Sequence, residues 1–183
     1  MSKTVMLSIR PKWCEKIAGG EKTIEVRKTK PKLEAPFKCY IYCTAERAGY
    51  DVLWVLDAPT REEQSFMAVS AYLENPKGAN KGNGKVIGEF TCERIVPITY
   101  DGGRLWCPTN AAFSPATCLS QTEIIAYIGD KGRCYGWHIS DLRIYDTPKE
   151  LSEFTGLRDT KFGAAPYEIK RPPQSWCYVE AME

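Results

Sequence analysis

The sequence predicts a mainly β fold of the α+β class, in which a small β-barrel carries peripheral helices. Short segments that alternate apolar and polar residues recur along the 183-residue chain, and glycine or proline turn signals separate them. The helical patterns are few and short, and they do not follow each strand as they would in a parallel α/β sheet. Both observations favour a barrel over a doubly wound sheet.

The first elements follow from local signals near the N-terminus. Residues 4–10 alternate as a strand, with three aliphatic side chains on one face. Pro11 suits the first turn of a helix, because its missing N–H would have no partner there in any case. Gly19 and Gly20 end that helix after two turns. The helix therefore leads the chain directly into residues 20–27.

The remaining elements are predicted from alternation and from capping boxes. Alternation predicts strands over residues 23–29, 37–44, 85–98, 135–145 and 176–179, and residues 157–173 are predicted as a polar meander. Ser or Thr followed three residues later by Glu predicts helices over 60–75, 120–129 and 147–156. Gly88 lies inside a predicted strand, where a glycine indicates a bulge or the close approach of another backbone.

The chain length predicts a single domain over residues 1–183. Residues 45–83 do not continue the strand pattern, so we interpret them as an insertion, with the 60–75 helix inside it. This insertion could form a lid over a site or a surface for a protein partner, and the sequence does not choose between these roles.

Composition excludes several protein classes. Hydrophobic residues make up 43% of the chain and charged residues 26%, as in ordinary globular proteins. No apolar run approaches the length of a membrane span, so we expect no membrane insertion. The N-terminal residues lack the apolar stretch of a signal peptide, and we expect a cytoplasmic protein. A net charge of +2 does not by itself indicate a nucleic-acid partner.

The eight cysteines are predicted to be reduced thiols, because such a chain is not expected in an oxidising compartment. Two pairs have a spacing of four, Cys39 with Cys43 and Cys134 with His138. Each pair lies in a predicted strand, where four residues span about 13 Å, which is too far for two ligands of one zinc ion. We therefore predict no metal site and no cofactor.

The segment most indicative of function is residues 20–27, which contains Lys22, Glu25 and Arg27. Strand alternation places Glu25 and Arg27 on the face opposite Ile24 and Val26. If the aliphatic pair enters a core, the three charged side chains could bind an anionic, hydrogen-bonding ligand. The alternative is an ordinary ion pair on the solvent face of an edge strand.

Basic residues are concentrated around this segment. Residues 10–32 carry a net charge of +5, and Arg10 lies at the predicted junction between the first strand and helix. A basic surface beside Lys22 and Arg27 would suit a phosphate-bearing partner. For the part from Lys28 to Lys32, a solvated lysine-rich loop is an equally good interpretation.

Residues 20–27 fit the pattern Gly-x-Lys-x-x-Glu-x-Arg, and in this they resemble the signature of the ASCH domain family. Residues 7–11 with the short helix after them, and residues 135–139, are also similar to that family. The resemblance implies a PUA-like β-barrel, with the early helix beside a cleft that contains the signature.

The resemblance also implies a role in RNA metabolism. The ligand would be RNA, a nucleotide or a modified nucleoside, held in the cleft. Arg10, Lys22, Glu25 and Arg27 would supply polar contacts, and Trp13 or Trp137 would supply a stacking face for a base. Core packing is the alternative role for each of these tryptophans.

A hydrolase is the alternative function that the resemblance implies. Some relatives are amidohydrolases that deacetylate N4-acetylcytidine, and ribonuclease activity is also associated with the family. Lys22 would then be the nucleophile or base, and Glu25 would carry a proton. Glu25 stands where those amidohydrolases resemble a Thr-bearing pattern, which speaks against the same reaction here. A further catalytic glutamate cannot be chosen among Glu89, Glu93 and Glu123, and His138 is expected to have a structural, hydrogen-bonding role.

Overall fold

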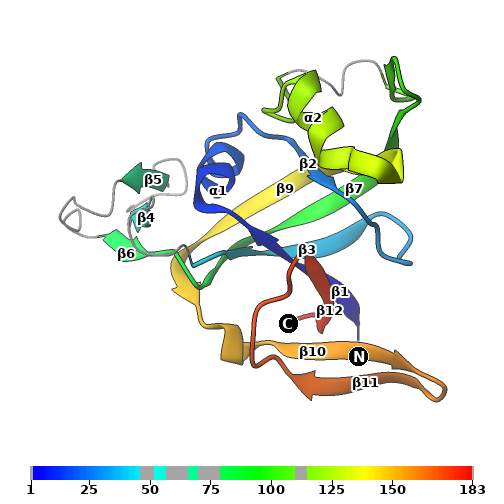
Figure 1. The fold of residues 1–183 in the computed structure, drawn as a ribbon. Helices are drawn as coiled ribbons and strands as arrows, with labels where there is room; N and C mark the ends of the chain where they lie inside the picture. The colour runs from blue at the N-terminus through cyan, green and yellow to red at the C-terminus, as the bar shows by residue number, and fades with distance from the viewer. Residues whose placement is uncertain (1, 46–51, 57–65, 70–78, 110–114, 183) are drawn as a thin grey trace.

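A mixed nine-stranded sheet forms the centre of the fold (Figure 1). The computed structural model describes residues 2–45, 52–56, 66–69, 79–109 and 115–182. The strand order is β11-β10-β12-β1-β3-β7-β9-β2, and β8 pairs with β7. The strands are β1 (Lys3–Ile9), β2 (Ile24–Arg27), β3 (Phe37–Cys43), β7 (Val86–Tyr100), β8 (Leu105–Trp106), β9 (Arg133–Lys149), β10 (Thr155–Thr160), β11 (Gly163–Glu168) and β12 (Trp176–Glu180).

This architecture confirms the mainly β class with peripheral helices. The hydrogen-bonded order starts at β11 and ends at β2, and within the described chain these two strands do not pair with each other. The sheet is therefore open; the sequence predicted a small barrel and did not decide whether it closes or stays open at an edge. At one edge, β10 and β11 form a hairpin that extends the sheet beyond β12.

The central strand β1 is covered on both faces. Val5, Leu7 and Ile9 enter one apolar cluster, as their alternation predicts, whereas Met6 packs in a second cluster on the other side. β1 pairs in parallel with β3 and antiparallel with β12. A parallel pair needs a crossover connection, and here the crossover contains the first helix and β2.

Two short α-helices of the described chain flank the sheet. In α1 (Pro11–Ala18), Cys14 and Ile17 are buried, and Gly20 beyond the helix adopts φ 75°. α2 (Gln121–Ile128) begins at the predicted capping box of Ser120 and ends at Gly129. Within the described residues, no helix combines the length and apolarity that crossing a membrane requires.

The 3₁₀ turns η3 (Gly129–Lys131) and η4 (Leu151–Glu153) complete the helical elements. The helix predicted over 147–156 is wrong, because β9 continues to Lys149 and only η4 follows. Pairing of Lys149 with Val86 on β7 extends the strand through the predicted helix start. The prediction of an irregular, polar meander over 157–173 is also wrong, since β10 and β11 form a regular antiparallel hairpin in this part of the chain.

The segment predicted as an insertion contains a separate three-stranded sheet. Its strands are β4 (Val52–Leu56), β5 (Phe66–Val69) and β6 (Ala79–Lys81), in the order β5-β4-β6. The helix predicted over 60–75 is wrong over 66–69, which form a strand, and the rest of that prediction lies outside the described residues. Leu53 and Val55 join the apolar cluster of α1 and β1, so β4 packs against the main core.

The long strands β7 and β9 pair along most of their length with several register shifts. One shift lies at Gly88, where an added Cβ would be 2.5 Å from the Arg143 carbonyl oxygen. The close backbone approach predicted at this glycine is therefore confirmed. At the other end of β9, residues 135–138 pair with β2, and this pairing holds the charged segment in the sheet.

Candidate functional site

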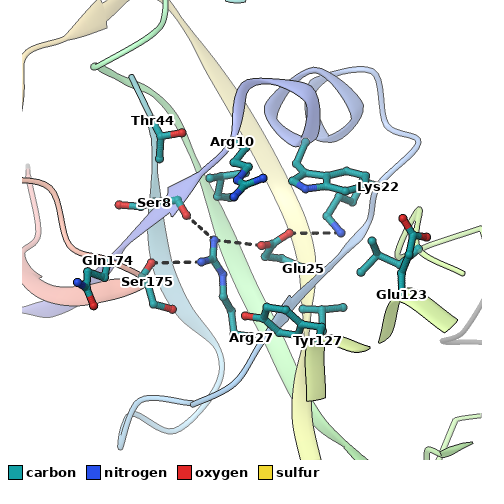
Figure 2. A pocket seen from close by; sticks show the side chains of 14 residues that line it. Ser8, Arg10, Lys22, Glu25, Arg27, Thr44, Glu123, Tyr127, Gln174 and Ser175 are labelled. Atoms are coloured by element: carbon teal, nitrogen blue, oxygen red, sulfur yellow. Dashed lines mark hydrogen bonds and ion pairs between the residues drawn. The ribbon is translucent and has the colours of Figure 1, made fainter. Parts of the chain in front are cut away.

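A cavity of about 480 Å³ lies between β2, the start of α1 and α2 (Figure 2). Its volume falls within the range of small-molecule sites, which is roughly 300–1,000 Å³. The lining residues that concern the chemistry are Ser8, Arg10, Trp13, Lys22, Glu25, Arg27, Glu123, Tyr127 and Ser175.

The alternation of β2 turns its charged residues into this cavity. Ile24 and Val26 pack in the apolar cluster that contains Ile124 of α2. Glu25 and Arg27 therefore share the opposite face, as predicted, and both line the cavity. They are only 6% and 7% exposed, which excludes the alternative of an ion pair on a solvent face.

Lys22 anchors the entrance to β2 from a buried position, with 2% of its surface exposed. Its Nζ donates to the Thr117 carbonyl at 2.6 Å and to the Ile24 carbonyl at 3.0 Å. It also lies 3.3 Å from Glu25 Oε2. An ammonium has three N–H donors; two of them are used on these backbone carbonyls, and the ammonium also forms an ion pair with Glu25.

Glu25 bridges the two cations of the site (Figure 2). Its Oε2 contacts Lys22, and its Oε1 lies 3.0 Å from Arg27 Nη2. A carboxylate offers about four acceptor positions. Glu25 thus retains capacity to accept hydrogen bonds from a ligand in the cavity.

The Arg27 guanidinium donates to two backbone carbonyls, one in β1 and one directly before β12. Its Nη2 donates to the Ser8 carbonyl at 2.7 Å, and its Nη1 donates to the Ser175 carbonyl at 3.4 Å. Its Nε is buried and has no hydrogen-bond partner among the described residues. An unpaired buried donor is costly, and this one belongs to a side chain that lines the cavity.

The three buried groups together carry two positive charges and one negative charge. Buried charge is costly unless it is compensated. Together with the free Arg27 N–H, the excess positive charge favours a ligand that brings a hydrogen-bond acceptor or an anion into the cavity.

The rim of the cavity comes from both helices. Arg10 precedes α1, is exposed, and makes no side-chain cap for that helix. The Trp13 ring is partly exposed, and Lys22 Nζ lies 5.2 Å from its centroid. On α2, Glu123 and Tyr127 are four residues apart and so lie on one helix face. Hydrogen bonds from Ser120 lower the pKa of Glu123, and burial raises the pKa of Tyr127.

Tyr127 and the two serines were not predicted from the sequence. A signal for Tyr127 was available: it follows Glu123 of the capping box by four residues, and this spacing places both side chains on one face of the helix. Ser8 and Ser175 act through backbone carbonyls, and side-chain chemistry gives no signal for such a role.

Trp137 does not line the cavity. Its side chain is fully buried, and its ring centroid lies 5.9 Å from Phe37 and 6.3 Å from Trp176. The role of stacking face predicted for Trp137 is therefore not available in this structure, and core packing describes its position. His138, Glu89 and Glu93 also lie outside the lining, whereas Glu123 belongs to it.

Metal ligands do not gather in the part of the chain that the structure describes: no three His, Cys, Asp or Glu side chains are placed to hold one ion. The eight cysteines are free, and six of them are buried. Burial raises the pKa of the Cys92 and Cys134 thiols to about 12.

No family model matches the sequence, and no curated protein matches it. Three crystal structures of an ASCH protein from Zymomonas mobilis are similar to the chain, each with a TM-score of 0.49. The first is 17% identical and covers 97% of this chain and 87% of its own. Two point mutants of the same protein are 17% and 16% identical and cover 98% and 97% of this chain, and 91% and 88% of their own. ASCH is also the family that residues 20–27 resemble.

Proposed function

We propose that the protein binds RNA or a nucleotide in the cavity beside Lys22, Glu25 and Arg27, and that it acts in RNA metabolism in the cytoplasm. The observation that carries the proposal is the buried, unpartnered Nε–H of Arg27 beside a carboxylate with spare acceptor capacity. A ligand that displaces the atoms packed over the Nε–H would find one donor and one acceptor there.

Nucleotides have the matching chemistry. A base edge presents donors and acceptors side by side, and guanidinium and carboxylate groups are the common partners of such edges. Arg10 lies at the exposed rim, where it can contact a phosphate, and the Trp13 ring offers a face on which a base can stack. The resemblance of residues 20–27 to the ASCH signature favours the same class of ligand.

The hydrolase alternative has less support from the geometry. A lysine nucleophile needs a free lone pair on Nζ. Lys22 Nζ instead donates to the Thr117 and Ile24 carbonyls and forms an ion pair with Glu25, which favours the charged ammonium without a lone pair. This arrangement suits a charged anchor that orients Glu25.

Calorimetric titration of the four ribonucleoside monophosphates into the wild type and Arg10→Ala tests the proposal. We expect at least one monophosphate to bind, and Arg10→Ala to weaken it about tenfold through loss of a charge-assisted hydrogen bond. Arg10 makes no side-chain cap, so its removal leaves the α1 terminus intact.

Arg104→Ala is the matched control, because Arg104 is exposed and lies outside the cavity lining. Its affinity should equal that of the wild type. The proposal fails if no monophosphate binds, or if Arg10→Ala and Arg104→Ala have the same affinity.

A further inference from the structure

The loop between β2 and β3, residues 28–36, carries three exposed lysines directly after the cavity. We call this segment the lysine loop. Lys28, Lys30 and Lys32 are exposed, whereas Pro31 between them is buried. The loop begins at the residue after Arg27, whose guanidinium lines the cavity.

The lysine loop is held in place on the sheet by specific contacts. Thr29 Oγ1 accepts a hydrogen bond from Trp176 Nε1 at 2.9 Å. The Lys32 backbone N–H donates to the Tyr178 hydroxyl at 2.8 Å. Leu33 packs against the main apolar cluster. The lysines therefore project from a backbone that is anchored to the sheet.

The three lysines have no carboxylate partner among the described residues. The ion pairs found there involve other lysines, such as Lys3, Lys16 and Lys38. Lys28 Nζ instead lies 5.1 Å from the Tyr127 ring centroid, and Lys30 Nζ lies 5.8 Å from that of Tyr135. Surfaces that bind single-stranded nucleic acid combine basic groups for the backbone with aromatic rings for the bases, and this surface has both.

This surface is continuous with the cavity. Tyr127 lines the cavity and also contacts Lys28. A volume of about 480 Å³ is small, so the neighbours of a nucleotide bound there would have to lie outside it. The lysine loop is an adjoining surface with the charge to receive their phosphates.

We infer that the lysine loop binds the sugar–phosphate backbone of a single-stranded nucleic acid, one nucleotide of which occupies the cavity. The inference rests on the proposed function and narrows its ligand to an oligomer with unpaired bases. The strand must be single because Glu25 and Arg27 are buried, and a base edge paired in a duplex could not reach them.

The test compares homopolymeric octaribonucleotides of the four bases with the corresponding monophosphates, by titration at several salt concentrations. We expect the best octamer to bind at least tenfold more tightly than its monophosphate. Lys28→Ala/Lys30→Ala/Lys32→Ala should remove this advantage. It should also lower the slope of log affinity against log salt by about 2, because each phosphate contact to a single strand contributes roughly 0.7.

The matched control is Lys81→Ala/Lys85→Ala/Lys149→Ala, which changes the net charge equally. Lys149 pairs with Val86, the first residue of β7; Lys81 ends β6, and Lys85 directly precedes β7. The start of β7 and β6 lie far from the loop between β2 and β3 (Figure 1). This variant should keep the octamer advantage. An octaglutamate peptide serves as a polyanion without bases and should bind at least tenfold more weakly than the octamer.

Three results would overturn the inference: an octamer that binds no more tightly than its monophosphate, an advantage that survives in the lysine-loop variant, or octaglutamate binding as tight as the octamer. The proposed function survives the first two results if the monophosphate still binds and depends on Arg10. Absence of binding by both octamer and monophosphate would remove the proposed function as well.

Discussion

Glu25 and Arg27 lie on the same face of β2, and Arg27 Nη2 is 3.0 Å from Glu25 Oε1 in a nearly solvent-free environment. The second oxygen of Glu25 contacts Lys22 Nζ. One carboxylate thus compensates two buried cations. The compensation stabilises the buried cations, and the Glu25 carboxylate still has acceptor positions for a ligand.

Glu25→Gln should destabilise the protein by about 3 kcal/mol, because it leaves the charges of Lys22 and Arg27 buried without compensation. Glu21→Gln is the control, since Glu21 pairs with Lys16 at the surface with 62% of its side chain exposed. That pair should contribute less than about 1 kcal/mol. Urea denaturation measures both values, and equal effects of the two substitutions would contradict the compensating role of Glu25.

Lys22 should not act as a nucleophile. Wild-type protein incubated with N4-acetylcytidine should release no acetate above the uncatalysed rate, because Lys22 Nζ donates to two backbone carbonyls and is ion-paired with Glu25 within the protein. Lys22→Met provides the comparison, with folding verified by circular dichroism. Acetate release that is present in the wild type and lost in Lys22→Met would show that the lysine is catalytic.

Stability should decrease as the pH falls below about 6.5 because of His138. Burial lowers the pKa of this histidine below its ordinary value of 6.5, Arg94 lowers it further, and Glu93 opposes the shift. The unfolded chain therefore takes up a proton in a pH range where the folded protein does not, and the free energy of unfolding falls there.

The effect can be assigned because His138 is the only histidine in the chain. The free energy of unfolding should be lower at pH 5.5 than at pH 7.5, and His138→Gln should remove most of the difference. An unchanged pH dependence in His138→Gln would mean that another group is responsible.

The parts of the fold that were predictable depend on local signals. Alternation in residues 23–29 placed Glu25 and Arg27 on one face, and the burial of Ile24 and Val26 made that face the wall of a cavity. Pro11 and the capping box of Ser120 defined the starts of the two helices. Each of these signals lies within a few residues of the feature that it predicts.

The errors arose where distant pairing outweighed local preference. A Thr-Pro-Lys-Glu sequence predicted a helix from 147, but pairing of β9 with β7 keeps residues up to Lys149 in the sheet. Trp137 was considered for ligand contact, yet packing against Phe37 and Trp176 removes it from the cavity. The acceptor of Arg27 at Ser175 is 148 positions away in sequence, and no local pattern indicates such a contact.

The Arg27 Nε–H, buried and without a hydrogen-bond partner among the described residues, should become hydrogen-bonded when a ligand enters the cavity. Proton–nitrogen NMR of the arginine Nε groups observes it directly, with its resonance assigned by loss of the signal in Arg27→Lys. Saturation with the monophosphate that binds best should move the Arg27 Nε–H proton downfield and slow its exchange with water. A ligand that saturates the protein and leaves this resonance unchanged would contradict the account.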